Sequence, residues 1–269
     1  MAKKKRAKSE RGSERVRDLP FQPPKSPWLV PFDGSFSLSK MRTQPKKADR
    51  GKDAEERNEG LLREHVAELY ELQQKLFADD RFSLLLVFQA MDAAGKDGTI
   101  RAVMTGVNPA GCQVSSFKGP THEELDHDFL WRVAKRLPER GRIGIFNRSH
   151  YEEVLVARVH PELLDAQRLP YRPEDGELWM GRFESIRAFE QHLARNGTVV
   201  LKFFLHVSKD EQRKRFLDRI EENDKNWKFN AGDVEERKHW DAYMAAYEEA
   251  LNQTSRPWAP WYAIPADDK

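Results

Sequence analysis

The stretch from Leu84 to Arg101, LLLVFQAMDAAGKDGTIR, constrains the fold of this chain more than any other. It opens on a continuous apolar run, Leu84–Phe88, which is the pattern of a strand buried on both faces of a parallel sheet. A loop of small residues, Ala90–Gly95, follows, and Lys96 then leads into a helix predicted to begin at Thr99. Strand, tight loop, lysine and helix are the parts of a phosphate-binding loop, whose N–H groups and helix dipole face an anion.

The strict form of this loop, G-x-x-x-x-G-K-[ST], is broken at two positions. Ala90 stands where the first glycine belongs, and Asp97 stands where Ser or Thr belongs. The loop also contains an extra carboxylate, Asp92. A carboxylate facing a polyphosphate is repelled unless a cation lies between them or it accepts a proton. We therefore interpret Asp92 as a ligand of Mg²⁺ or a catalytic base, with a solvated turn aspartate as the weaker alternative.

Apolar runs recur along the chain and are separated by helical patterns. The amphipathic helix Asp53–Asp79 precedes the first strand, and the later predicted strands are Cys112–Phe117, Arg142–Phe146, Thr198–Leu205 and Trp261–Ile264. This alternation predicts an α/β fold of three layers, α/β/α, with a parallel sheet of about five strands. Capping boxes, Thr121 with Glu124 and Ser208 with Glu211, mark the starts of two helices.

The first 52 residues differ in composition from the remainder. They hold 15 Lys and Arg against 5 Asp and Glu, which leaves −8 on the other residues of a chain whose net charge is +2. We expect residues 1–52 to form a basic arm, disordered to about Asp18 and then extended along the body through apolar residues from Phe21 to Phe36. Residues 53–269 are expected to form one catalytic domain.

Simple counts argue against several classes of protein. The chain has no apolar run long enough to span a membrane, and its basic start is not followed by the apolar segment of a secretory signal. Its one cysteine, Cys112, cannot form an internal disulfide, and such usage suits a reducing compartment. We therefore expect a cytoplasmic protein with no membrane partner.

A second polar cluster follows the predicted strand Arg142–Phe146, at the edge where ligands bind in open α/β sheets. A carboxylate usually holds magnesium at this position in phosphate-loop enzymes, whereas this chain has Asn147, followed by Arg148. An amide cannot act as a base, so metal binding and base catalysis fall more heavily on Asp92. The guanidinium fork of Arg148 suits phosphate, with a structural salt bridge as the alternative.

Cations concentrate in residues 209–230, which we interpret as a lid. They are Lys209, Arg213, Lys214, Arg215, Arg219, Lys225 and Lys228. Gln212, Arg215 and Arg219 are spaced three and four apart and share one helical face. Alone, such a helix is more often a solvated face. Beside a phosphate loop, it is suited to close its cations over a transferring phosphoryl group.

Five motifs in linear order carry a family resemblance. They are FQAMDAAGKDGTI, VNPAGCQVSSFKGP, ELDHDFLWR, LPERGRIGIFNRSHYEEVLVARVHPE and NWKF. Together they resemble the polyphosphate kinase 2 family over roughly Leu61 to Lys269, and most closely its members that act on nucleoside mono- and diphosphates. Many relatives in that family carry Asp-Arg-Ser in place of Asn147-Arg148-Ser149. Gln212–Phe216 and Trp227-Lys228 are similar to the family's lid motif.

This resemblance implies a phosphotransferase that moves the terminal phosphate of inorganic polyphosphate to AMP or ADP, reversibly and with Mg²⁺ or Mn²⁺. It also implies adenine or guanine nucleotides as partners and a homo-oligomer, either a dimer or a tetramer. The expected catalytic residues are Asp92, which also binds the metal, Lys96, Arg148, Arg215 and Arg219. The expected phosphate and nucleotide contacts are Ala93, Ala94, Gly95, Asp97, Gly98, Thr99, Lys118, Asp128, Arg132, Asn147 and Lys228.

Two other hypotheses share parts of this pattern. An ATP-dependent nucleoside monophosphate kinase would have the same fold, lid and magnesium, and only the family resemblance separates its donor from polyphosphate. A non-catalytic polyanion or nucleic-acid binding module would use the basic arm, but it requires neither Asp92 nor a lid. Stacking aromatics are also not interleaved with the basic residues of the first twenty positions, so we expect no nucleic-acid partner.

Overall fold

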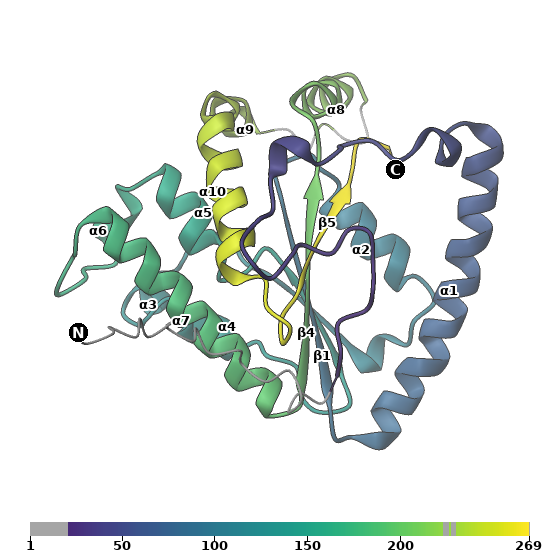
Figure 1. The fold of residues 1–269 in the computed structure, drawn as a ribbon, viewed down its shortest axis with the longest axis horizontal. Helices are drawn as coiled ribbons and strands as arrows, with labels where there is room; N and C mark the ends of the chain where they lie inside the picture. Colours follow the sequence, from purple (N-terminus) through teal and green to yellow (C-terminus); the bar gives the residue numbers. More distant parts are fainter. Residues whose placement is uncertain (1–20, 223–225, 227–229, 269) are drawn as a thin grey trace, which may run out of the picture.

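The computed structural model describes residues 21–222, 226 and 230–268 (Figure 1). Its centre is a five-stranded sheet in which every pair of neighbouring strands is parallel, in the order β2-β3-β1-β4-β5. The strands are β1 (Ser83–Ala90), β2 (Cys112–Ser116), β3 (Ile143–Asn147), β4 (Thr198–His206) and β5 (Trp261–Pro265). Each predicted strand is present, which confirms the α/β fold with a parallel sheet.

Helices cover both faces of the sheet and so form the expected three layers (Figure 1). One face carries α1 (Lys52–Asp79) and α2 (Lys96–Met104), and the other carries α5 (Glu152–Val159), α7 (Asp175–Arg195) and α10 (Trp240–Thr254). Two helices, α8 (Lys209–Glu221) and α9 (Ala231–Glu236), lie beyond the carboxyl ends of the strands. The shorter elements are α3 (His122–Leu125), α4 (Trp131–Ala134), α6 (Leu163–Ala166), η2 (Leu38–Lys40), η3 (Lys47–Asp49), η4 (Pro109–Gly111) and η6 (Arg237–His239).

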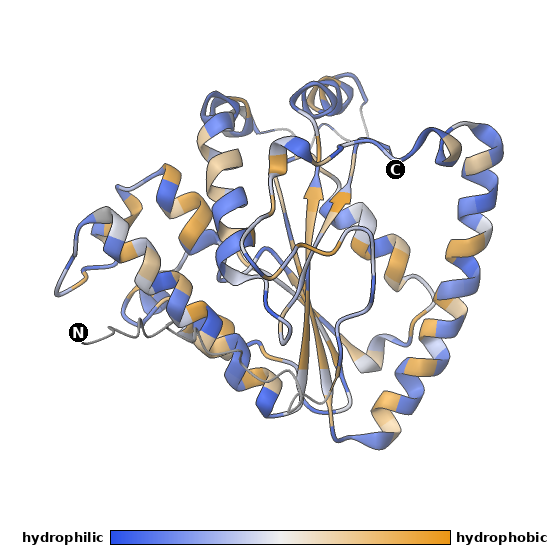
Figure 2. Cartoon of the chain, in the orientation of Figure 1, coloured by the Kyte–Doolittle hydropathy of each residue, from blue (hydrophilic) through white to orange (hydrophobic). Residues whose placement is uncertain are grey.

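The central strand β1 lacks polar alternation because helices cover both of its faces. Leu85 and Val87 belong to the larger core, whereas Phe88 packs in a second cluster with Ile100 of α2. Figure 2 shows the strands as an apolar centre between helices whose outer surfaces are hydrophilic. The sequence pattern therefore places β1, and the loop that follows it, in the middle of the sheet.

The long helix α1 packs through a narrow seam. Gln73 is buried, and Leu69 and Leu76 pack on the second cluster. Its other sides are largely exposed and carry charged residues together with exposed large apolar side chains, Leu61, Leu62, Tyr70, Leu72 and Phe77. Within the part of the chain that the structure describes, no helix has the length and apolar character needed to cross a membrane.

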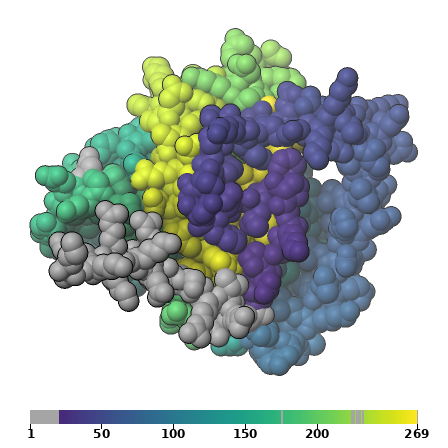
Figure 3. All heavy atoms as spheres, viewed as in Figure 1, coloured from purple at the N-terminus to yellow at the C-terminus, as the bar shows by residue number. Residues whose placement is uncertain are grey.

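The described part of the N-terminal arm lies across the body. Trp28 O accepts a hydrogen bond from Ala263 N at 2.8 Å, and Val30 N donates to Trp261 O at 2.9 Å, so this segment adds an antiparallel bridge to β5. Figure 3 shows the purple segment lying over the yellow C-terminal region. The most basic part of the arm, residues 1–20, lies outside the described residues.

Candidate active site

The loop between β1 and α2, named the phosphate loop below, turns through two left-handed residues. These are Ala93, with φ of 60°, and Gly95, with φ of 106°. The helix α2 begins directly after Gly95, at Lys96, rather than at the predicted Thr99. Because the first N–H groups of a helix have no acceptor within it, this earlier start brings them to the loop, where an anion can bind.

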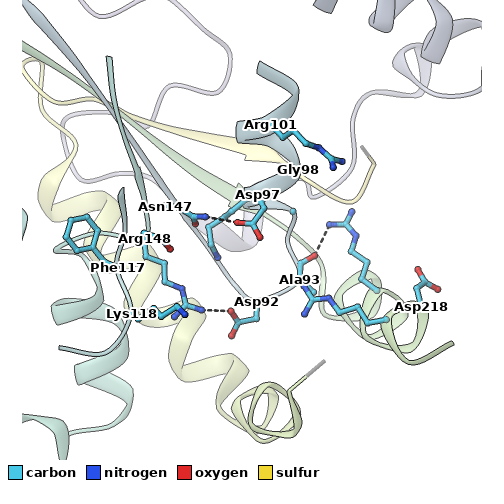
Figure 4. A pocket seen from close by; sticks show the side chains of 15 residues that line it. Asp92, Ala93, Asp97, Gly98, Arg101, Phe117, Lys118, Asn147, Arg148 and Asp218 are labelled. Carbon is cyan, nitrogen blue, oxygen red and sulfur yellow. Dashed lines mark hydrogen bonds and ion pairs between the residues drawn. The ribbon is translucent and has the colours of Figure 1, made fainter. Parts of the chain in front are cut away.

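A cavity of about 600 Å³, named the basic cavity below, opens at this loop (Figure 4). The predicted residues that line it are Asp92, Ala93, Gly95, Lys96, Asp97, Gly98, Lys118, Asn147, Arg148, Arg215 and Arg219. The charged residues that were not predicted there are Arg101 and Asp218. Six basic and three acidic side chains thus share the lining, so the cavity favours an anionic ligand. Once α2 starts at Lys96, Asp97 and Arg101 fall four residues apart on one face, which accounts for Arg101.

The side chains of Asp92 and Arg148 form an ion pair in the middle of the site. Arg148 Nη2 donates to Asp92 Oδ1 at 2.8 Å, and Arg148 Nη1 lies 3.8 Å from Glu152 Oε2 (Figure 4). Arg148 is 39% exposed and Asp92 is 30% exposed. A pair with this much solvent contact contributes little to stability, so both groups are able to exchange partners when a charged substrate arrives.

Lys96 turns back across the phosphate loop. Its Nζ donates to the carbonyl oxygen of Ala90 at 2.8 Å, and its side chain is only partly exposed. Burial of the ammonium group lowers the pKa of Lys96 from its usual value, although the nearby Asp92 carboxylate opposes this shift. A bound phosphate would add negative charge beside the ammonium group and favour its protonated form.

Asn147, at the end of β3, binds a carboxylate from the next layer. Its Nδ2 donates to Asp97 Oδ1 at 2.6 Å (Figure 4). The strict loop pattern would have a hydroxyl at position 97, and a carboxylate is usual at position 147. In this chain the carboxylate is at position 97 and the neutral amide is at position 147. Together with Asp92, the site therefore has two carboxylates close to the phosphate loop.

A second cavity, of about 370 Å³, shares Asp92 and Arg148 with the basic cavity. Its other charged and aromatic lining residues are Glu152, Asp233, Glu236, Arg237, Tyr243 and Tyr247. Burial raises the pKa of Glu152, and it also raises the pKa of Asp233. Tyr243 and Tyr247 lie on α10 and belong to the hydrophobic core. Both are buried, but they also face this cavity.

The helix α8 begins at the predicted cap, but only half of the predicted capping box forms. Ser208 Oγ accepts from Glu211 N at 3.1 Å. The N–H of Ser208 itself donates to Asp267 at 2.6 Å, and Glu211 binds Arg215 of its own helix at 2.9 Å. The C-terminal segment therefore takes the place that Glu211 was predicted to occupy. The capping box of Thr121 with Glu124 is complete.

Several predicted contacts lie elsewhere. Among the described residues, Ala94, Thr99, Asp128 and Arg132 are not part of the basic lining, and Lys228 lies outside the described residues. Arg132 is buried and donates to the carbonyl oxygen of Lys118 at 2.9 Å. It thus holds the segment that brings Lys118 to the cavity. The nucleotide contacts of Asp128 and Arg132 stay predictions.

Comparison with known proteins identifies the family. The sequence model of the family "Polyphosphate kinase 2 (PPK2)" matches residues 52–269. The chain belongs to the polyphosphate kinase 2 family. It is 40% identical to the chain in the crystal structure of polyphosphate kinase 2 from Arthrobacter aurescens TC1, with a TM-score of 0.78. That match covers 87% of this chain and 80% of the other.

Two relatives of this chain are named for different acceptor nucleotides. The ADP-polyphosphate phosphotransferase of Rhodopseudomonas palustris is 59% identical over 226 residues, which cover 84% of this chain and 78% of the relative. The AMP/ADP-polyphosphate phosphotransferase of Meiothermus ruber is 47% identical over 241 residues, covering 89% and 85%. This polyphosphate kinase 2 is therefore a polyphosphate:nucleotide phosphotransferase, as the motifs implied.

Proposed function

We propose that this polyphosphate kinase 2 transfers the terminal phosphoryl group of inorganic polyphosphate to ADP, and also to AMP, in a reversible reaction. The observation that supports this proposal most strongly is the pair of cavities that share Asp92 and Arg148. Phosphoryl transfer needs a donor and an acceptor whose reacting oxygens approach in line. Two cavities that share an ion pair fit that requirement.

The charges of the two cavities suggest which substrate each one takes. The basic cavity holds six cationic side chains and suits the polyanionic chain of polyphosphate. The second cavity carries Glu152, Asp233 and Glu236 together with two tyrosines. Carboxylates repel a polyanion but can accept hydrogen bonds from ribose hydroxyls, and aromatic rings can pack against a nucleotide base. We therefore assign the donor to the basic cavity and the nucleoside to the second cavity.

The choice of acceptor rests on the relatives. One of them is named for ADP alone and the other for AMP and ADP. ADP is thus the acceptor that both names share, and it is the firmer part of the proposal. AMP as a second acceptor follows the relative from Meiothermus ruber and the sequence motifs that resemble its branch.

The loop residues fit a divalent cation that arrives with the phosphate chain. Within the described part of the chain, no three His, Cys, Asp or Glu residues form a group that could hold a metal ion by themselves. Mg²⁺ is commonly held by one or two carboxylates, with phosphate oxygens and water completing its coordination. Asp92 and Asp97 supply such carboxylates, and Asn147 orients the second one. When bound, the cation would neutralise phosphate charge.

In this mechanism the protein positions its substrates and stabilises charge. Lys96 and the N–H groups at the start of α2 bind the phosphate chain. Arg148 leaves Asp92 and contacts the transferring phosphoryl group, while Arg219 adds positive charge from α8. Asp92, close to the acceptor, holds the metal or accepts a proton when the acceptor is still protonated. Such electrostatic stabilisation is the main contribution that a protein makes to phosphoryl transfer.

Assays with a single donor test the proposal. Purified protein with Mg²⁺ and ADP should form ATP when polyphosphate is the only donor, and AMP should give ADP under the same conditions. Formation of ADP from AMP with ATP as the only donor, and none with polyphosphate, would instead support the monophosphate kinase hypothesis. Lys96→Ala serves as the control for contaminating activity. Absence of ATP from polyphosphate and ADP would refute the proposed function.

A further inference from the structure

The phosphate loop is held from behind by two side chains of α8. Gln212 Nε2 donates to the carbonyl oxygen of Asp92 at 2.9 Å. Arg215 Nη1 donates to the carbonyl oxygens of Ala93 and Ala94, at 3.2 and 2.9 Å. Both donors are buried, since Gln212 is 1% exposed and Arg215 is 6% exposed. Three consecutive carbonyl groups of the loop are thus directed at one helix.

The direction of these carbonyl groups fixes the direction of the loop N–H groups. In a trans peptide the C=O and the N–H point to opposite sides. Because the carbonyls of Asp92 and Ala94 point to the donors on α8, the N–H groups of Ala93 and Gly95 point away from those donors. Both Ala93 and Gly95 line the basic cavity. The N–H of Ala94 donates instead to Met91 O at 3.2 Å and closes the turn.

This loop conformation needs support from outside the loop. Ala93 has a positive φ of 60°, which is disfavoured for a residue with a Cβ atom. The bonds from α8 hold the peptide groups on both sides of that residue. Arg215 is itself fixed, because its Nη2 donates to Ala266 O at 2.6 Å and its Nε donates to Glu211 at 2.9 Å. The guanidinium therefore joins the loop to the C-terminal segment.

We infer that Gln212 and Arg215 are positioning residues that aim the N–H groups of the phosphate loop at the donor. This inference rests on the proposed function of the basic cavity as a polyphosphate site. For Arg215, it replaces the expected direct contact with the transferring phosphoryl group. Gln212 separates the two roles, because its amide is neutral and does not line the basic cavity. Its other hydrogen bond, which Oε1 accepts from Arg237 Nη1 at 2.7 Å, lies on the side of the second cavity.

Equilibrium binding of tripolyphosphate, measured by calorimetry with Mg²⁺ and without nucleotide, tests this role. Gln212→Met removes the donor and keeps a side chain of similar length. We expect Gln212→Met and Arg215→Ala each to weaken binding about 3- to 10-fold, the effect of losing one or two hydrogen bonds of ordinary strength. The matched control is Arg213→Ala, which removes a charge from the exposed side of the same helix and should stay within about twofold.

Thermal unfolding of each variant establishes that it is folded. Wild-type affinity in folded Gln212→Met would overturn the positioning role and leave the donor site in place. Failure of the wild-type protein to bind tripolyphosphate would instead overturn the donor site itself. If Gln212→Met does not fold, Gln212→Leu decides, because leucine also removes the donor and leaves every charge of the basic cavity in place. Weakened binding in folded Gln212→Leu supports positioning, and wild-type binding overturns it.

Discussion

The two cavities that share Asp92 and Arg148 are built in different ways. The basic cavity is assembled from the phosphate loop, the ends of two neighbouring strands and two helices, α2 and α8. The second cavity is assembled mainly from α5, α9 and α10, which approach from separate parts of the chain. One has an excess of cationic side chains, and the other combines carboxylates with tyrosines. A single ion pair is thus shared by two cavities of different charge, which is the basis for the proposed assignment of the donor to one and the nucleoside to the other.

Substitution of Asp92, which belongs to the shared ion pair, or of Lys96 in the same loop should have the largest effect on turnover. We expect Lys96→Ala and Asp92→Asn each to lower turnover on the order of 10²- to 10³-fold, because each removes charge aimed at the reacting phosphate or its metal. Steady-state kinetics with polyphosphate and ADP measures this. Lys75→Ala, on an exposed side of α1, is the control and should behave as wild type. Near-normal turnover of either site variant would show that the two cavities do not meet at the reacting group.

The basic cavity was largely predictable because of the geometry of parallel sheets. The carboxyl ends of neighbouring strands lie at one edge, so Asp92 and Lys96 after one strand and Asn147 and Arg148 after another had to converge. The start of α2 was misplaced for a local reason. Gly98 is a poor helix former, and the pattern therefore suggested a start beyond it. The left-handed Gly95 fixes the start three residues earlier.

The second cavity was not predictable to the same extent. Of its residues, Glu152 could have been predicted from spacing, because it lies four residues after Arg148, and a helical turn brings such residues together. Asp233 and Glu236 come from α9, and Tyr243 belongs to a stripe that reads as ordinary core. Nothing in their spacing indicates that three helices pack around one space. The same is true of Gln212, whose partner is a backbone carbonyl 120 residues away.

Kinetics that vary one substrate at a time sharpen the division between the cavities. Lys118→Ala removes a cation from the basic cavity and should raise the KM for polyphosphate about 3- to 10-fold, less at high salt. Tyr243→Phe keeps the ring in the second cavity and removes the hydroxyl that donates to Glu236 at 2.7 Å. It should raise the KM for ADP about 2- to 5-fold and leave the KM for polyphosphate unchanged. If both variants raise the KM of the same substrate, the assignment of donor and acceptor to separate cavities is wrong.

The smallest expected effect is a pH dependence of the free energy of unfolding, caused by a histidine that contacts Glu236 of the second cavity. His160 Nε2 lies 3.0 Å from Glu236 Oε2, and its Nδ1 lies 3.2 Å from Glu162. Burial acts to lower the pKa of His160, but the two carboxylates outweigh it and raise the pKa above its usual value of 6.5. The rings of His239 and Tyr243 are the other titratable groups packed there, and the Tyr243 hydroxyl donates to the same Glu236. In the described lining of the basic cavity there is no histidine.

The sign of this effect follows from the raised pKa. A histidine that is protonated more readily when folded stabilises the protein fully below pH about 6.5, and this contribution is lost as the pH rises through the folded pKa. His160→Gln should therefore lower the free energy of unfolding by about 0.3–1 kcal/mol at pH 6 and have little effect at pH 9. Urea unfolding at both pH values measures the difference. An equal decrease in the free energy of unfolding at pH 6 and at pH 9 would show that His160 acts through packing and not through its charge. A KM for polyphosphate that shifts with this substitution would contradict the separation of the cavities, because Glu236 lines only the second one.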